Sequence, residues 1–205
     1  NDREQFLRIL DQTQASLRDA PEDQLLGMAP HSLRAVSPDA LEKIVESRSS
    51  GPVHIHIAEQ LKEVEDIQAN YGSRPVEWLL KNVAVDSRWS LIHATHMTQE
   101  ETQNLAKSGA VVGLCPITEA NLGDGVFDGS GLLLSGGKYG IGSDSNVRIS
   151  LTEELRLLEY SQRLVRKERN VMTNEEGSVG RALYSDALAG GAQALGRKSG
   201  SITPG

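Results

Sequence analysis

The sequence is poor in cysteine, in aromatic side chains and in long hydrophobic runs. Cys115 is the single cysteine among 205 residues, so a disulfide framework is excluded and a reducing compartment such as the cytoplasm is expected. No stretch of about 18 apolar residues is present, and we therefore expect no membrane span. A signal-peptide pattern is also missing, which again favours the cytoplasm.

Basic charge is scarce as well. The chain has 28 acidic against 21 basic side chains, a formal net charge of −7, and no block of Lys and Arg. This balance argues against a nucleic-acid-binding surface. The first residue is Asn1 rather than Met, so we expect the natural chain to begin earlier.

Short apolar runs rich in Val, Ile and Leu alternate with longer segments of helical period. Five such runs are expected to be strands: Leu25–Pro30, Pro52–Ala58, Ser90–Thr95, Ala110–Cys115 and Tyr139–Gly142. Helix start signals lie between them: Ser37-Pro38, Thr98 with Glu101, and Ser150 with Glu153. Strands that alternate with helices predict βαβ units and a parallel sheet, within one α/β domain over residues 1–205.

Two architectures fit this alternation, a doubly wound sheet and part of a (β/α)8 barrel. A doubly wound sheet usually carries a glycine-rich phosphate turn after its first strand, and none is present. A barrel needs eight strands and typically about 250 residues. With five expected strands, the barrel interpretation requires sequence beyond this chain.

Polar side chains fall at the ends of three expected strands, where barrel enzymes place their chemistry. His54 and His56 share one face of their strand, and Glu59 follows where the strand turns into its loop. His93 ends the next strand, and Asp144 ends the last. Two imidazoles and a carboxylate suit zinc or iron, and a metal lowers the pKa of bound water to about 7.

Each of these residues also has a plainer interpretation. His56 alone would usually be a structural histidine, Asp144 a turn former, and Glu59 a residue of the first helical turn. Their coincidence at three strand ends favours a site, in which Glu59 could move a proton. Cys115 is expected to be a small core residue.

A second polar group follows the first expected strand. Arg34 presents a planar fork that suits a carboxylate, which indicates a small anionic substrate, although a surface arginine fits the spacing equally well. The polar, glycine-punctuated segment 118–125 is expected to be a loop that either lies on the surface or rims the site.

The motif His-Ile-Ala-Glu at 56–59, His93 and Gly-Ser-Asp-Ser at 142–145 resemble the amidohydrolase superfamily. The resemblance implies a metal-dependent (β/α)8 TIM barrel, of which this chain would be about strands 4 to 8. It implies that His56 and Asp144 bind one divalent metal together with a first-strand His-x-His pair, zinc being favoured and iron an alternative. Glu59, His93 and Asp144 would be the catalytic residues.

Three further segments, 29–36, 115–125 and 153–160, are similar to the formimidoylglutamate deiminases of that superfamily. This narrower resemblance implies metal-dependent hydrolysis of N-formimino-L-glutamate to N-formyl-L-glutamate and ammonia, a reaction of histidine degradation. His31 and Arg34 would bind the carboxylates of that substrate.

The first-strand His-x-His pair, strands one to three and the small β domain of the superfamily are not in this sequence. We therefore expect the chain to be the back part of a longer enzyme, inactive and prone to associate by itself. Two alternatives stay open: another deaminase or chlorohydrolase of the superfamily that acts on a nucleobase-like heterocycle, and a non-catalytic α/β module. A homodimer is also left open.

Overall fold

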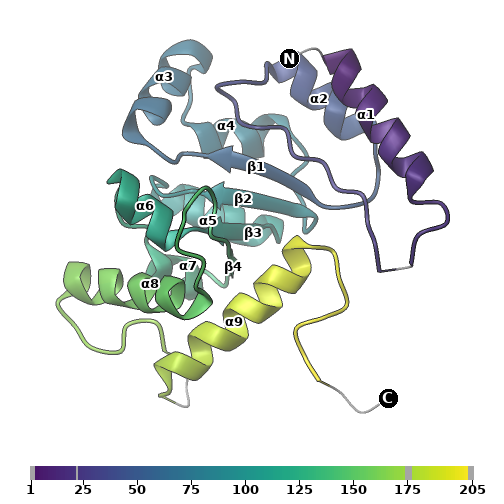
Figure 1. The fold of residues 1–205 in the computed structure, drawn as a ribbon. Coiled ribbons are helices and arrows are strands. Elements are labelled where there is room, and N and C mark those ends of the chain that lie inside the picture. The colour runs from purple at the N-terminus through teal and green to yellow at the C-terminus, as the bar shows by residue number, and fades with distance from the viewer. Residues whose placement is uncertain (1–2, 22, 174–176, 203–205) are drawn as a thin grey trace.

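The computed structural model describes residues 3–21, 23–173 and 177–202. Within these residues, one sheet of four parallel strands has the order β1-β2-β3-β4 (Figure 1). The strands are β1 (Val53–Ile57), β2 (Trp89–His93), β3 (Val111–Leu114) and β4 (Lys138–Ile141). Each strand pairs with the next one along the chain, as in a barrel, whereas a doubly wound sheet reverses its strand order at a switch point.

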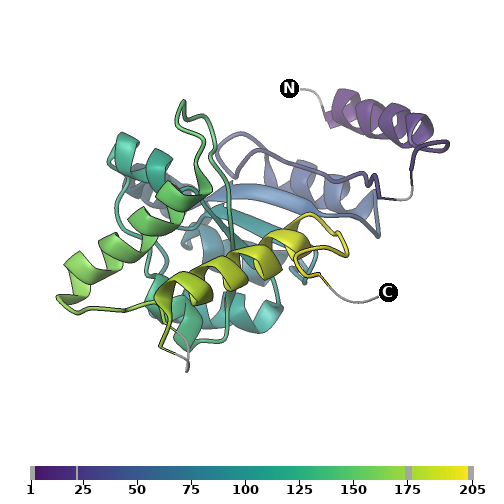
Figure 2. The same cartoon turned by 60° about the horizontal axis from the view of Figure 1, so that its bottom comes forward.

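Helices connect the strands and cover the sheet. They are α1 (Arg3–Ser16), α2 (Pro38–Glu46), α3 (Leu61–Tyr71), α4 (Pro75–Asn82), α5 (Gln99–Ser108), α6 (Pro116–Leu122), α7 (Gly129–Leu134), α8 (Leu151–Arg166) and α9 (Val179–Ala194). In Figure 1, α4 and α5 lie behind the strands and α9 runs below them, and the turned view of Figure 2 shows α9 crossing in front of the sheet. Among the described residues, no helix is long and apolar enough to cross a membrane.

The two faces of β1 differ as the alternation of the sequence predicts. Val53, Ile55 and Ile57 are at most 1% exposed and belong to the hydrophobic core. His54 and His56 point to the other face and stay partly exposed. Because all four strands are parallel, their carboxyl ends meet at one edge of the sheet, and His56 lies one residue before that edge.

The expected first strand, Leu25–Pro30, is wrong as a strand. This segment makes isolated parallel bridges to β1, Met28 with Val53 and, further on, Ser32 with His56. Pro30 stands between the two bridges, has no N–H and cannot take part in a continuous ladder. The chain therefore runs beside β1 as an extended edge.

The predicted helix starts are present. Ser37 accepts a hydrogen bond from the N–H of Ala40 at the start of α2, and Thr98 forms a reciprocal capping box with Glu101 at the start of α5. Ser150 accepts from the N–H of Glu153 at the start of α8. These caps satisfy N–H groups that have no partner within their own helix.

The last turn of α9 lies under the amino-terminal ends of the strands, opposite the edge that carries His56. The side-chain amide of Gln193 donates to the carbonyls of Ser87 and Gly109, which precede β2 and β3. His54 Nε2 donates to the carbonyl of Ala194 at 2.8 Å. Helix α9 thus connects β1, β2 and β3 at this end of the sheet.

Close packing of α9 on β4 depends on missing side chains in both elements. A Cβ atom at Gly190 would lie 1.9 Å from the carbonyl oxygen of Tyr139, whereas a Cβ at Gly191 would have nothing within 4 Å. A Cβ atom at Gly140 of β4 would in turn lie 3.1 Å from the backbone of Gly191, so helix and strand backbones approach each other closely where Gly190 and Gly140 stand.

We expect Gly190→Ala to destabilise the fold by about 1–3 kcal/mol, because the new methyl group must push α9 away from β4. The matched control, Gly191→Ala, should stabilise it by about 0.5–1 kcal/mol, because alanine loses less backbone entropy in a helix. Thermal unfolding of both variants tests this pair. Equal shifts of the unfolding midpoint would contradict the proposed contact.

Candidate active site

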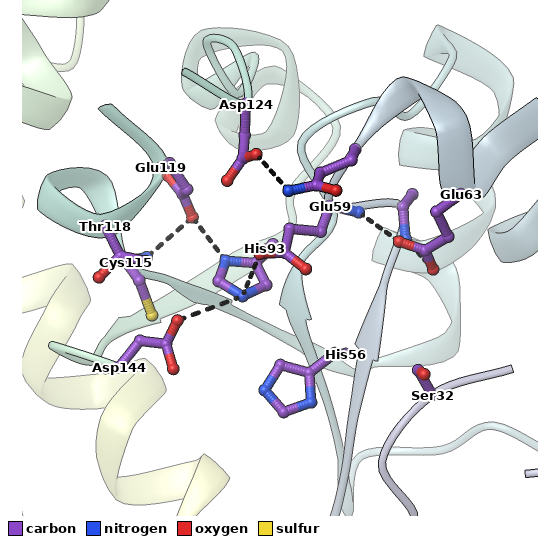
Figure 3. A network of polar contacts seen from close by, with 12 residues as sticks. Ser32, His56, Glu59, Glu63, His93, Cys115, Thr118, Glu119, Asp124 and Asp144 are labelled. Carbon is purple, nitrogen blue, oxygen red and sulfur yellow. Dashed lines mark hydrogen bonds and ion pairs between the residues drawn. The ribbon is translucent and has the colours of Figure 1, made fainter. Parts of the chain in front are cut away.

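The carboxyl ends of β1, β2 and β4 bring four predicted residues together around His93 (Figure 3). Nε2 of His93 lies 3.8 Å from Glu59 Oε1 and 3.8 Å from Asp144 Oδ2. The rings of His56 and His93 are stacked with their centroids 5.6 Å apart. The sequence prediction that these three strand ends form one cluster therefore holds in the structure.

The backbone at these strand ends adopts an unusual conformation. His93, Ala94 and Asp144 have positive φ angles of 69°, 49° and 50°, and Ala58, the residue before Glu59, has 50°. Residues other than glycine rarely occupy this region, and each such residue costs about 1–3 kcal/mol. Strained backbone of this kind clusters at functional sites and here turns the polar side chains toward one another.

His56 is oriented by the segment beside β1. Its Nδ1 donates to the backbone carbonyl of His31 at 3.0 Å, which leaves Nε2 as the nitrogen with a free lone pair. The two rings lie 4.9 Å apart, and Nδ1 of His31 is 2.9 Å from the hydroxyl of Ser32. A histidine that donates one N–H to a carbonyl is the usual arrangement of a metal ligand.

His93 is 1% exposed and bonds to a carboxylate that the sequence prediction missed. Its Nδ1 donates to Glu119 Oε1 at 3.2 Å. Burial disfavours the charged imidazole, but the hydrogen bond and charge of Glu119, helped by Glu59 and Asp144, outweigh burial and raise the pKa of His93.

Glu119 belongs to α6, so the predicted loop over 118–125 is wrong as far as Leu122. Its Oε1 also accepts from the N–H of Cys115 at 2.9 Å. A signal for this short helix is present in the sequence: Pro116 is its first residue, and Gly123 follows its end with a φ of 73°. Burial of its glutamate, by contrast, has no local sequence signal.

Glu63 is a second residue that the sequence prediction missed. It lies in the first turn of α3 and is 2% exposed. Its two oxygens accept from the N–H groups of Ala58 and Glu59 at 3.0 and 2.9 Å. This carboxylate stabilises the turn after β1 and thereby sets the position of Glu59.

Arg34 lies at the mouth of the cluster, as predicted, but it contacts a member of the site. Its guanidinium forms an ion pair with Glu59 Oε2 at 3.0 Å. The side chain of Arg34 is 36% exposed and that of Glu59 is 13% exposed. Arg34 is therefore partly exposed to solvent while it bonds to Glu59.

The remaining histidine and the cysteine lie outside this cluster. His96 Nε2 donates to the carbonyl of Asp124 at 2.7 Å, so it connects two loops. Burial raises the pKa of the Cys115 thiol, which keeps it protonated, as expected for a core residue rather than a nucleophile.

The donor set fits part of a metal site. Among the residues that the structure describes, no group of three or more His, Cys, Asp or Glu side chains is arranged to hold a metal ion. His56 Nε2 and the Asp144 carboxylate are donors of the kind that zinc accepts, but a catalytic zinc takes three protein ligands. This chain therefore offers fewer donors than one complete site needs.

Comparison with known proteins identifies the family of this chain. The family model described as "Amidohydrolase family" matches residues 3–205. Formimidoylglutamate deiminase of Pseudomonas aeruginosa is 51% identical over 100% of this chain and 45% of its own length. The 5-methylthioadenosine/S-adenosylhomocysteine deaminase of Shouchella clausii is 32% identical over 82% of this chain and 39% of its own.

Solved structures show the same fold. An amidohydrolase from Brucella melitensis superimposes with a TM-score of 0.93 and 56% identity, over 96% of this chain and 44% of that one. An adenosine deaminase from Xanthomonas campestris with bound zinc gives a TM-score of 0.83 and 25% identity, over 94% of this chain and 44% of that one. This chain therefore spans less than half the length of these relatives, and it belongs to the metal-dependent amidohydrolase family, with the α/β fold of part of a (β/α)8 barrel.

Proposed function

We propose that this chain carries the carboxyl-terminal half of the active site of a formimidoylglutamate deiminase. The reaction would hydrolyse N-formimino-L-glutamate to N-formyl-L-glutamate and ammonia. The observation that carries the proposal is the convergence of Glu59, His93 and Asp144 within 3.8 Å contacts, with Arg34 at the mouth. The 51% identity to the Pseudomonas aeruginosa enzyme supports this substrate. Further sequence would complete the barrel and the site.

His56 and Asp144 would hold one divalent metal, which we propose is zinc. The free Nε2 of His56 and the carboxylate of Asp144 support this assignment, and zinc is bound in the Xanthomonas campestris relative. When bound, such a metal activates water as a nucleophile at neutral pH. The remaining donors would come from outside this chain.

In the hydrolysis, the oxygen of water bonds to the formimino carbon, and the bond from that carbon to the terminal nitrogen breaks. Both protons of the water end on this nitrogen, which leaves as ammonia. His93 Nε2 faces Asp144 and Glu59 and would accept a proton from the attacking water. The Glu59 carboxylate would take the other proton of the water and deliver it to the leaving nitrogen, and His93 would return its proton to the same nitrogen.

Arg34 would bind a carboxylate of the substrate, and His31 beside it would contribute a second polar contact. The guanidinium at present bonds to Glu59. A substrate carboxylate would compete for the same fork, because two parallel N–H donors suit either partner. Substrate binding would in this way release the Glu59 carboxyl for proton transfer.

A second candidate is deamination of a nucleobase-like heterocycle, which the 32% identical Shouchella clausii deaminase favours. This second reaction would not require Arg34, since a neutral base has no carboxylate for its guanidinium to bind.

We propose a cytoplasmic location, which the buried free thiol of Cys115 fits, and a small-molecule substrate without nucleic-acid or membrane partners. We include a homodimer among these proposals.

The reaction is tested by ammonia release from N-formimino-L-glutamate, with guanine and cytosine as controls, by the complete protein that contains this chain. We expect release from the formimino substrate alone and about one metal per protein. Release from a base alone would keep the cluster and overturn the substrate assignment. Absence of release from any of them would favour the non-catalytic alternative.

Arg34→Lys should weaken use of the anionic substrate, because lysine cannot form a two-pronged bond with a carboxylate. We expect kcat/KM to fall about 10-fold or more, which corresponds to about 1.4 kcal/mol, while the metal content is unchanged. Arg156→Lys is a matched control, since Arg156 is an exposed arginine on α8 that pairs with Glu153. Normal turnover by Arg34→Lys would refute the role of Arg34.

His56→Asn should lower the metal content of the complete protein, because it removes the Nε2 donor. His96→Asn is the control, since His96 bonds to the carbonyl of Asp124 and lies outside the cluster around His93. Metal analysis after dialysis measures the difference. Equal metal content in the two variants would show that His56 is not a ligand.

A further inference from the structure

We propose that Glu119 is a positioning residue that fixes the proton of neutral His93 on Nδ1 and keeps Nε2 free toward Glu59 and Asp144. The catalytic consequence of this arrangement rests on the proposed function. The placement of the proton itself does not, and it can be measured separately.

The distances around His93 determine which nitrogen carries the proton. Nδ1 lies 3.2 Å from Glu119 Oε1, within hydrogen-bonding range. Nε2 lies 3.8 Å from both Glu59 and Asp144, beyond that range. An ionised carboxylate only accepts, so the partner at Nδ1 must be an N–H, and the lone pair of the neutral ring remains on Nε2.

Glu119 is itself held firmly in place. The residue is 4% exposed, and the N–H of Cys115 donates to the same oxygen that His93 contacts. On the same helix, the N–H of Ile117 donates to the buried Glu154 at 2.8 Å. The hydroxyl of Thr118 donates to the carbonyl of Ser143, next to Asp144, at 3.0 Å. Helix α6 therefore connects the ends of β3 and β4 and presents Glu119 to β2.

The position of this proton matters because a histidine can accept a proton only through a nitrogen that carries none. If the proton moved to Nε2, His93 would present a donor to the reacting water. A buried carboxylate that holds Nδ1–H has the same task in serine hydrolases, where the wrong tautomer lowers kcat by about 10⁴-fold.

Two substitutions separate the acceptor from the charge. Glu119→Met keeps much of the volume but removes the acceptor, so the proton is free to move to Nε2. In Glu119→Gln the amide oxygen must face Cys115, because the NH₂ group cannot accept from that N–H. Since Cys115 and His93 share one oxygen, the same amide oxygen still accepts from Nδ1, and the tautomer should be retained.

Glu154→Gln is the matched control. Glu154 is 1% exposed and also accepts a hydrogen bond from a backbone N–H of α6. That N–H belongs to Ile117, so this hydrogen bond does not involve His93. It tests whether loss of any buried carboxylate under this helix produces the same effect.

The experiment uses the complete, metal-loaded protein with ¹⁵N-labelled histidine, at alkaline pH where the imidazoles are neutral. His93→Asn identifies the signals of His93. We expect Nδ1–H in the parent protein, in Glu119→Gln and in Glu154→Gln, and a shift toward Nε2–H in Glu119→Met. In parallel, kcat should fall about 100-fold or more in Glu119→Met with KM changed little, and Glu119→Gln should recover most of it.

Nδ1–H retained in Glu119→Met, or Nε2–H in the parent protein, would overturn the proposal. If Glu119→Met fails to fold, the spectrum of the parent protein still shows which nitrogen of His93 carries the proton. A protein that shows the expected tautomers but releases no ammonia from N-formimino-L-glutamate would overturn the proposed function and leave the role of Glu119 intact.

Discussion

Hydrogen bonds from backbone N–H groups to buried carboxylates hold the candidate site in shape. Glu63 binds the turn after β1, Glu119 the turn after β3, and Glu154 the start of α6. Buried carboxylates are costly unless their oxygens have partners, and turned-back strand ends leave N–H groups that need acceptors. At Glu63 and Glu119 each group removes the penalty of the other, whereas Oε1 of Glu154 is buried without a partner and burial raises the pKa of this carboxyl. The left-handed backbone at His93 and Asp144 lies within this arrangement.

Much of the fold could be predicted from the periodicity of the hydrophobic residues, and much of the cluster from the positions of polar residues at strand ends. His56, His93 and Asp144 were found because parallel strands bring their carboxyl ends to one edge, so three separate sequence positions become neighbours. Glu63 and Glu119 could not be found in this way. A glutamate in a first helical turn is usually solvated, and only tertiary packing shows that these two are buried.

The failed predictions also have physical causes. Residues 25–30 have the composition of a strand, but Pro30 interrupts the ladder and leaves isolated bridges. The glycines and polar residues of 118–125 predict a loop, whereas Pro116 starts a helix that runs to Leu122. The sequence leaves Arg34 as either a ligand of a substrate carboxylate or a surface arginine, and the structure adds its ion pair with Glu59, a contact that spans 25 positions of the chain.

The position of helix α9 separates two properties that often conflict in enzymes, the stability of the fold and the chemistry of the active site. Its last turn, through Gln193 and Ala194, ties strands together at the end of the sheet away from Asp144 and His93. Substitutions at this end can therefore raise or lower stability without touching a reacting group. A barrel built in this way can keep strained strand ends for chemistry, because hydrogen bonds at the opposite end hold the strands together, and selection can alter the two ends independently.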